Sequence, residues 1–242
     1  MSDLDLGENP ALPPHTPKGL LVVEALTFTL VGAGLILASC LGWTSSSPTE
    51  IFGFLSGGLC VWLGVRQSIW TWPLGLANYC AFFVLFARTR LFADATLQII
   101  YFALGIYGWR NWSKGESSEK RPAVTKACEG EWLFLVVASP FSLWGMYQWL
   151  IFAKGASPFW DSLTTVLSLA AQFLMCRKKL ENWLIWIVAD LIYVPLYVHR
   201  GLPLTAVLYL VFLAMCVAGW FQWKTSLVHE RVEENHGRPV RK

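Results

Sequence analysis

Long apolar runs alternate with short polar breaks along most of the chain. Each run is about twenty residues long, which is the length that an α-helix needs to cross the hydrocarbon core of a bilayer. No period-two alternation typical of membrane barrel strands interrupts these runs, so we predict helices throughout. Eight segments fit the pattern: 19–43, 50–66, 70–88, 91–112, 131–154, 157–177, 181–199 and 201–223.

The two ends of the chain differ from these apolar segments. Residues 1–18 are rich in proline and acidic side chains and lack a basic signal-peptide region, so we predict a disordered tail that is not cleaved. Residues 224–242 are predicted to form a solvated, flexible cytoplasmic tail. Segment 19–43 is the weakest span because it contains Glu24, and two alternatives stay open for it: it spans the bilayer, or it lies at the interface.

The composition supports an integral membrane protein of the all-α class. Hydrophobic residues make up 55% of the chain and charged residues only 14%, whereas a soluble domain carries about a quarter charged residues. The net charge of +3 is confined to loops and tails, which argues against nucleic acid as a partner. The six cysteines form no CxxC pair, so we expect no disulfide framework, no metal site and no cofactor.

The basic residues predict the orientation of the helices. Of the 19 Lys and Arg residues, four fall in one set of alternate loops, namely Arg88, Arg90, Lys154 and Arg200, and the remaining fifteen fall in the other set. Because basic loops are retained in the cytoplasm, both termini should face the cytoplasm. If segment 19–43 does not span, the N-terminus moves outside and the other seven helices keep their orientation.

An internal repeat emerges when the chain is shifted by 111 residues. Seven identical pairs then align: Trp72 with Trp183, Leu91 with Leu202, Ala95 with Ala206, Leu97 with Leu208, Gly108 with Gly219, Trp109 with Trp220 and Trp112 with Trp223. Shared membrane composition explains part of this match, but the common GW..W helix ending is the least accidental part. We predict two parallel three-helix units, 50–112 and 157–223, joined by a linker helix at 131–154, as in the SWEET facilitators.

Two stretches of sequence carry a resemblance to a known family. WPLGLANYCAFFVLFARTRLFADATLQIIYFALGIYGWRNW at 72–112 and PFWDSLTTVLSLAAQFLMCRKKLENWLIW at 158–186 resemble the PnuC family of nicotinamide riboside transporters. The resemblance implies a multi-pass protein of the bacterial inner membrane, a homotrimer, and functional coupling to a cytoplasmic riboside kinase. The extra segment 19–43 departs from the seven-helix core of that family.

Two amides and a tyrosine in the first repeat are candidate ligands for substrate. Asn78 and Gln98 lie within predicted spans, where polar side chains are expensive and usually serve a cavity, a substrate or a helix contact. Their amides suit a carboxamide or ribose hydroxyls, and Tyr101 could share the face of Gln98. The alternative is that both amides join neighbouring helices.

The second repeat contains a richer set of candidates. Trp183, Trp186, Asp190, Tyr193 and Tyr197 follow three- and four-residue steps, so they share one stripe of a helix, and Asn182 precedes them. Such a stripe should point inward, because a lipid-facing aspartate is untenable. Aromatic faces attract a cationic pyridinium ring, and a carboxylate accepts hydroxyl hydrogens. The competing interpretation is an aromatic belt at the membrane interface with an interhelical hydrogen bond.

These residues favour a transporter over an enzyme. The four histidines lie in tails or at a helix end, away from any activated nucleophile. No phosphate-binding GxxxxGK[ST] motif occurs, so we expect facilitated diffusion of nicotinamide riboside, trapped by phosphorylation in the cytoplasm. The alternatives are a proton- or sodium-coupled symporter of a nucleoside-like or sugar-like solute, in which Asp190 could carry a proton, a membrane-embedded enzyme and a channel.

Overall fold

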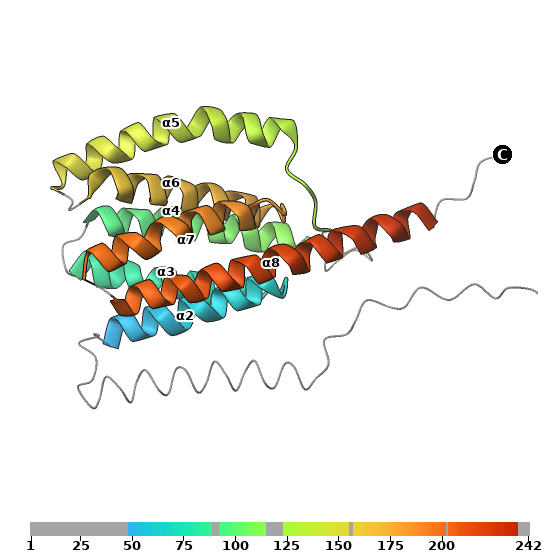
Figure 1. Cartoon of the computed structure of the whole chain (residues 1–242), viewed down its shortest axis with the longest axis horizontal. Coiled ribbons are helices and arrows are strands. Elements are labelled where there is room, and N and C mark those ends of the chain that lie inside the picture. The colour runs from blue at the N-terminus through green and yellow to red at the C-terminus, as the bar shows by residue number, and fades with distance from the viewer. Residues whose placement is uncertain (1–47, 89–91, 115–122, 155–156, 202, 237–242) are drawn as a thin grey trace, which may run out of the picture. The chain divides into compact units, whose positions relative to one another are not determined.

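The computed structural model describes residues 48–88, 92–114, 123–154, 157–201 and 203–236, and every regular element in these ranges is a helix. Each of the seven apolar segments predicted from residue 50 onward coincides with a helix (Figure 1). The helices are α2 (Pro48–Val65), α3 (Thr71–Arg88), α4 (Phe92–Ser113), α5 (Glu129–Phe152), α6 (Pro158–Cys176), α7 (Asn182–His199) and α8 (Pro203–His236).

The structure describes most of the C-terminal end of the chain but not the predicted N-terminal segments. The helix predicted at 201–223 ends too early, because α8 continues without a break to His236. The charges of this extension solvate a helix as well as they solvate a coil, so charge alone did not distinguish the two. The predicted tail 1–18 and the predicted helix 19–43 lie outside the described residues.

Four described helices are long and apolar enough to cross a membrane: α5, α6, α7 and the part of α8 from Thr205 to His229. The apolar part of α2, Leu55–Val65, is shorter. α3 and α4 are less apolar, and both contribute polar side chains to the cavity described below. A membrane-spanning helix that faces a polar cavity carries polar residues on that face, and these lower its mean hydropathy.

The helices of the unit Phe52–Lys242 pack in a connected bundle. α3 packs on α4, α7 packs on α8, and α6 contacts both α4 and α7. α5 packs against α6 (Figure 1) and leaves large apolar side chains exposed, among them Val136, Phe141 and Phe152. An exposed apolar surface of this kind suits contact with lipid tails.

Two turns in the bundle have the same conformation. The α2–α3 turn contains Gln67 with φ 53°, and the α6–α7 turn contains Lys178 with φ 52°. Their backbone N–H groups donate to matching carbonyls, Gly64 at 2.9 Å and Met175 at 3.0 Å. Left-handed φ is uncommon for such residues, so its recurrence 111 positions apart is informative. It accords with the predicted repeat, and the complete three-plus-one-plus-three arrangement stays a prediction.

Candidate functional site

A cavity of about 360 Å³ lies among α2, α3, α4, α6, α7 and α8. Its volume falls within the range of about 300–1,000 Å³ that is usual for small-molecule sites. The lining is mostly apolar, as such sites generally are. The polar side chains that reach it are Cys60, Thr71, Asn78, Tyr79, Tyr101, Ser168, Gln172, Asp190, Tyr193, Tyr209 and Cys216.

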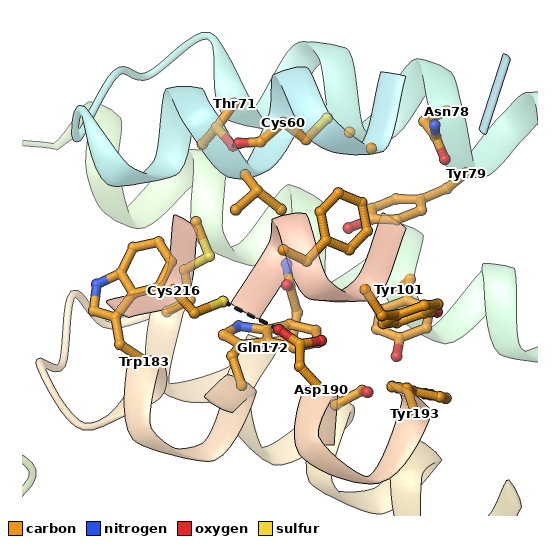
Figure 2. Close-up of a pocket in the computed structure, with 18 of the residues that line it drawn as sticks. Cys60, Thr71, Asn78, Tyr79, Tyr101, Gln172, Trp183, Asp190, Tyr193 and Cys216 are labelled. Carbon is orange, nitrogen blue, oxygen red and sulfur yellow. Dashed lines mark hydrogen bonds between the residues drawn. The ribbon is translucent and has the colours of Figure 1, made fainter. Parts of the chain in front are cut away.

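The structure brings together most of the residues proposed from the sequence. The predicted site residues that line the cavity are Asn78, Tyr101, Trp183, Trp186, Asp190 and Tyr193. In Figure 2 the side chains from α3, α4 and α7 converge on the same space. The predicted inward stripe of α7 therefore does face the interior of the bundle.

Two predicted residues lie elsewhere. Gln98 is not among the described residues that line the cavity, whereas its neighbour Leu97 is. Asn182 is fully buried at the start of α7, where its Nδ2 donates to the carbonyl oxygen of Lys179 at 2.6 Å. This geometry gives Asn182 a part in shaping the α6–α7 turn.

Asp190 is the carboxylate of the cavity. It is 2% exposed, and Cys216 Sγ donates to its Oδ2 at 3.5 Å (Figure 2). From the described part of the chain this thiol is the one hydrogen-bond donor to the carboxylate. A thiol is a weak donor, so much of the acceptor capacity of Asp190 is open to a ligand in the cavity.

Stacked tyrosine rings form one wall of the cavity. Tyr79 and Tyr101 stack with their ring centroids 5.5 Å apart and their planes 19° apart. Tyr193 packs on Tyr209 with a centroid distance of 4.4 Å, and Tyr209 also stacks on Tyr197 at 5.1 Å. A wall of rings offers flat faces to an aromatic ligand and hydroxyl groups to its polar edges.

Amide and hydroxyl groups complete the polar lining. Asn78 donates from Nδ2 to Ser56 Oγ, which fixes its orientation toward α2. Ser168 and Gln172 of α6 were missed by the sequence analysis, although they are 4% and 7% exposed and both reach the cavity. The signal that could have found them is the one used for Asn78, namely an amide inside an apolar span, with a serine four residues earlier on the same helix face.

Trp183 closes one end of the cavity. It is 1% exposed, and its ring meets that of Trp223 edge to face at a centroid distance of 5.4 Å. The ring also covers Gly219 so closely that an added Cβ there would lie 2.6 Å from Trp183 Cε2. Trp186, one turn further along α7, is only partly buried and is the more accessible of the two tryptophans.

The described lining of the cavity carries little charge. Among the described residues that line it, Asp190 is the one charged side chain, and neither Lys nor Arg contributes. No group of three or more His, Cys, Asp or Glu side chains that could hold a metal ion is found in the part of the chain that the structure describes. The cavity thus combines aromatic faces, two amides and a carboxylate, which suits a neutral or cationic ligand.

Comparisons with known proteins agree with this chemistry. A family model described as nicotinamide mononucleotide transporter matches residues 47–225. The nicotinamide riboside transporter PnuC of Escherichia coli is 29% identical over 206 residues, covering 73% of this chain and 85% of that protein. The riboflavin/roseoflavin transporter RibM of Streptomyces davaonensis is 26% identical over 185 residues, covering 72% of this chain and 84% of that protein.

A solved structure shares the fold. The crystal structure described as that of the vitamin B3 transporter PnuC matches with a TM-score of 0.66 and 23% sequence identity. The match covers 86% of this chain and 92% of that chain. The expected all-helical membrane fold is confirmed.

Proposed function

The chain belongs to the nicotinamide mononucleotide transporter family, and on that premise we propose that it carries nicotinamide riboside across the bacterial inner membrane by facilitated diffusion. Membership confirms a multi-pass membrane transporter and agrees with the expectation that the chain is not an enzyme. The choice of riboside, the mode of transport and the assembly are our proposals.

The observation that carries the choice of substrate is the charge of the cavity. The riboside is a cationic pyridinium bearing a neutral sugar, whereas the mononucleotide adds a phosphate with nearly two negative charges. The lining described here offers Asp190 and no basic side chain. Burying a phosphate beside an unpaired carboxylate is strongly unfavourable, so the cavity should accept the riboside and reject the mononucleotide.

We assign the contacts by matching chemical groups. Trp186 and the tyrosine wall provide ring faces that attract the cationic pyridinium. Asp190 accepts hydrogen bonds from ribose hydroxyls, and the amides of Asn78 and Gln172 suit the carboxamide. Gln98 and Asn182, which lie away from the described lining, are left out of this set.

Facilitated diffusion follows from the sparse charge of the site. A dedicated cation site needs several oxygen ligands, and Asp190 is the one carboxylate in the described lining. Net uptake would then depend on a cytoplasmic riboside kinase, because the phosphorylated product no longer fits the cavity. The alternative is a symporter in which Asp190 carries a proton, and its weak partner Cys216 is the observation that favours it.

We also propose the assembly and topology expected from the sequence. The matched turns at Gln67 and Lys178 support two parallel three-helix units joined by α5. The distribution of Lys and Arg supports a cytoplasmic C-terminus. The family resemblance supports a homotrimer with one cavity in each protomer.

Calorimetric titration of the purified protein tests the substrate. Nicotinamide riboside should bind, and the mononucleotide should bind at least about a hundredfold more weakly, since an unpaired buried charge costs several kcal/mol. Riboflavin, the compound named for the Streptomyces relative, is the competing ligand. Tighter binding of riboflavin or of the mononucleotide than of the riboside would reject the assignment.

Flux into proteoliposomes tests the mode of transport. The riboside should equilibrate to equal concentrations inside and outside when this protein is the only one present. Accumulation above the external concentration on imposing a proton gradient, abolished by Asp190→Asn, would establish the symporter instead.

A further inference from the structure

Four tryptophans from four helices meet at one end of the cavity. Trp72 of α3, Trp112 of α4, Trp183 of α7 and Trp223 of α8 are each no more than 3% exposed. Their rings form a continuous series, with centroid distances of 5.3 Å from Trp72 to Trp112, 6.0 Å from Trp112 to Trp223 and 5.4 Å from Trp223 to Trp183. We call this group the tryptophan cluster.

The indole groups of the cluster bridge the two halves of the bundle. Trp112 Nε1 of α4 donates to the carbonyl oxygen of Met175 in α6 at 3.2 Å. Trp223 Nε1 of α8 donates to the carbonyl oxygens of Gly64 and Val65 in α2, both at 3.2 Å. Trp112 and Trp223 are 111 residues apart, and so are the acceptors Met175 and Gly64. Each half therefore holds the end of the other half through the same contact.

The cluster separates the cavity from the end of the bundle. Trp72 and Trp183 line the cavity, whereas Trp112 and Trp223 lie behind them and are not among its described lining residues. Val124, in the strap formed by residues 123–128, is 1% exposed within the same apolar core. The strap pairs with the α6–α7 turn, where Thr125 N donates to Lys178 O at 3.1 Å and Leu180 N donates to Thr125 O at 2.9 Å.

Basic residues mark this end as the cytoplasmic one. Arg66, Arg110, Arg177 and Lys224 each lie within two positions of a residue of this apolar core. The rule that basic residues remain in the cytoplasm then places the cluster on the inner side of the cavity. A solute leaving the cavity on that side has to pass between these rings.

Two indole N–H groups of the tryptophan cluster have no hydrogen-bond acceptor among the described residues. Nε1 of Trp72 and Nε1 of Trp183 are buried, and no described residue accepts a hydrogen bond from either of them. An unpaired buried N–H is unfavourable relative to one that meets water. Opening would break the bonds of Trp112 and Trp223 but would hydrate Trp72 and Trp183, which offsets part of its cost.

We propose that the tryptophan cluster is the inner gate of this transporter, and that it opens by breaking the two reciprocal indole-to-carbonyl hydrogen bonds between the halves. The inference rests on the proposed function only in that the chain moves a solute through the cavity. The competing account is a permanent core that stays closed while the helices move elsewhere. The two accounts differ in whether weakening the cluster exposes the cavity from one side or from both.

A native thiol of the cavity reports the opening. Cys60 lines the cavity and is partly exposed, so a protein that retains Cys60 and has the other cysteines replaced can be labelled there with a charged, membrane-impermeant thiol reagent. Trp112→Phe and Trp223→Phe keep an aromatic ring and remove the donor. Each should raise the labelling rate from the inner side roughly threefold to tenfold, and labelling from the outer side should not change.

Trp109→Phe is the matched control, because Trp109 lies one turn before Trp112 on α4 and is 41% exposed. It should leave labelling from both sides unchanged. Gln67→Gly gives a second test at the rim: it removes the acceptor of Lys178 Nζ at 3.4 Å and the donor to Ser226 Oγ at 3.1 Å, and glycine tolerates the left-handed backbone. It should raise inner labelling in the same direction.

The result that overturns the gate is unchanged inner labelling in both Phe variants and in Gln67→Gly. An equal rise from both sides also overturns it, since that outcome indicates a loosened bundle. The readout uses the thiol reagent and no riboside, so a protein that failed to transport nicotinamide riboside would still report on the gate. Failure of the substrate proposal and failure of the gate are thus separate outcomes.

Discussion

The two ends of the bundle around the cavity are held together by different chemistry. At the tryptophan end the four tryptophans are almost completely buried, and two of them, Trp112 and Trp223, bond to backbone carbonyls. At the opposite end, the tyrosine end, Tyr193, Tyr197 and Tyr209 stack on one another, and the Arg200 guanidinium lies 6.0 Å from the centroid of the Tyr197 ring. Arg200 Nη2 of the α7 C-cap there donates to both carboxylate oxygens of Asp161 in α6, at 2.7 and 2.8 Å. Those two side chains are 25% and 28% exposed. Figure 2 shows Trp183 and Tyr193 on opposite sides of Asp190, one toward each end.

Because of this difference, we expect the two ends to respond differently to the salt concentration of the solvent. Buried rings resist separation through packing, which salt in the solvent does not screen. An ion pair that is a quarter exposed is weak and weakens further as ionic strength rises. We therefore expect the tryptophan end to depend on ring shape and the tyrosine end to depend on charge and salt.

The largest expected effect comes from filling the space under a tryptophan. Gly219→Ala places a Cβ 2.6 Å from the Trp183 ring, and overpacking of this kind destabilises by about 1–3 kcal/mol. The melting temperature of the purified protein in detergent should fall by several degrees. The loss should be accompanied by faster inner labelling of Cys60, because the displaced ring belongs to the gate.

Gly145→Ala in α5 is the control, because nothing lies within 4 Å of the Cβ that it would add. Alanine is the better helix former, so this variant should be neutral or slightly more stable. Equal behaviour of the two variants would show that the packing over Gly219 is not a special feature of the tryptophan end.

The fold could be predicted closely because its causes are local. Apolar length determines where a helix crosses a membrane, so the segments from residue 50 onward coincide with helices. The exception is the end of α8, which continues to His236. The charged residues after Trp223 concealed an apolar position in this stretch, because Leu227 lies one turn further along and is buried in the same core as Trp223.

The site could be predicted only in part. The stripe from Trp183 to Tyr193 was visible because one helix carries it, and it does line the cavity. Gln98 lies on the same helix as Tyr101, yet only Tyr101 is among the described lining residues, because the rotation of α4 depends on packing against α3 and α6. The bonds of Trp112 and Trp223 join helices far apart in the chain and required the structure.

An effect of intermediate size is expected at Trp186, which lines the cavity. Trp186→Ala should weaken riboside binding about tenfold, since a desolvated contact between a cation and a ring is worth on the order of 1–2 kcal/mol. Leu184→Ala on the same helix is the control, because Leu184 is 42% exposed and is not among the described lining residues. Titration calorimetry measures both variants. Equal affinity in the two would remove Trp186 from the site.

The smallest expected effect is at the tyrosine end. Arg200→Gln removes the ion pair with Asp161, and a partly exposed pair contributes at most about 1 kcal/mol. Labelling of Cys60 from the outer side should rise by no more than about fivefold at low salt. At high salt the wild type should approach the variant, because screening weakens the pair that the variant lacks.

Arg88→Gln is the control, because it removes an exposed charge at the end of α3, and it should not change the labelling rate. Inner labelling should be much less sensitive to salt in every one of these proteins, because Lys178, whose Nζ lies 4.6 Å from the centroid of the Trp112 ring, is itself buried. A salt-dependent inner rate, or an outer rate that ignores both salt and Arg200, would contradict the assignment of packing to one end and charge to the other.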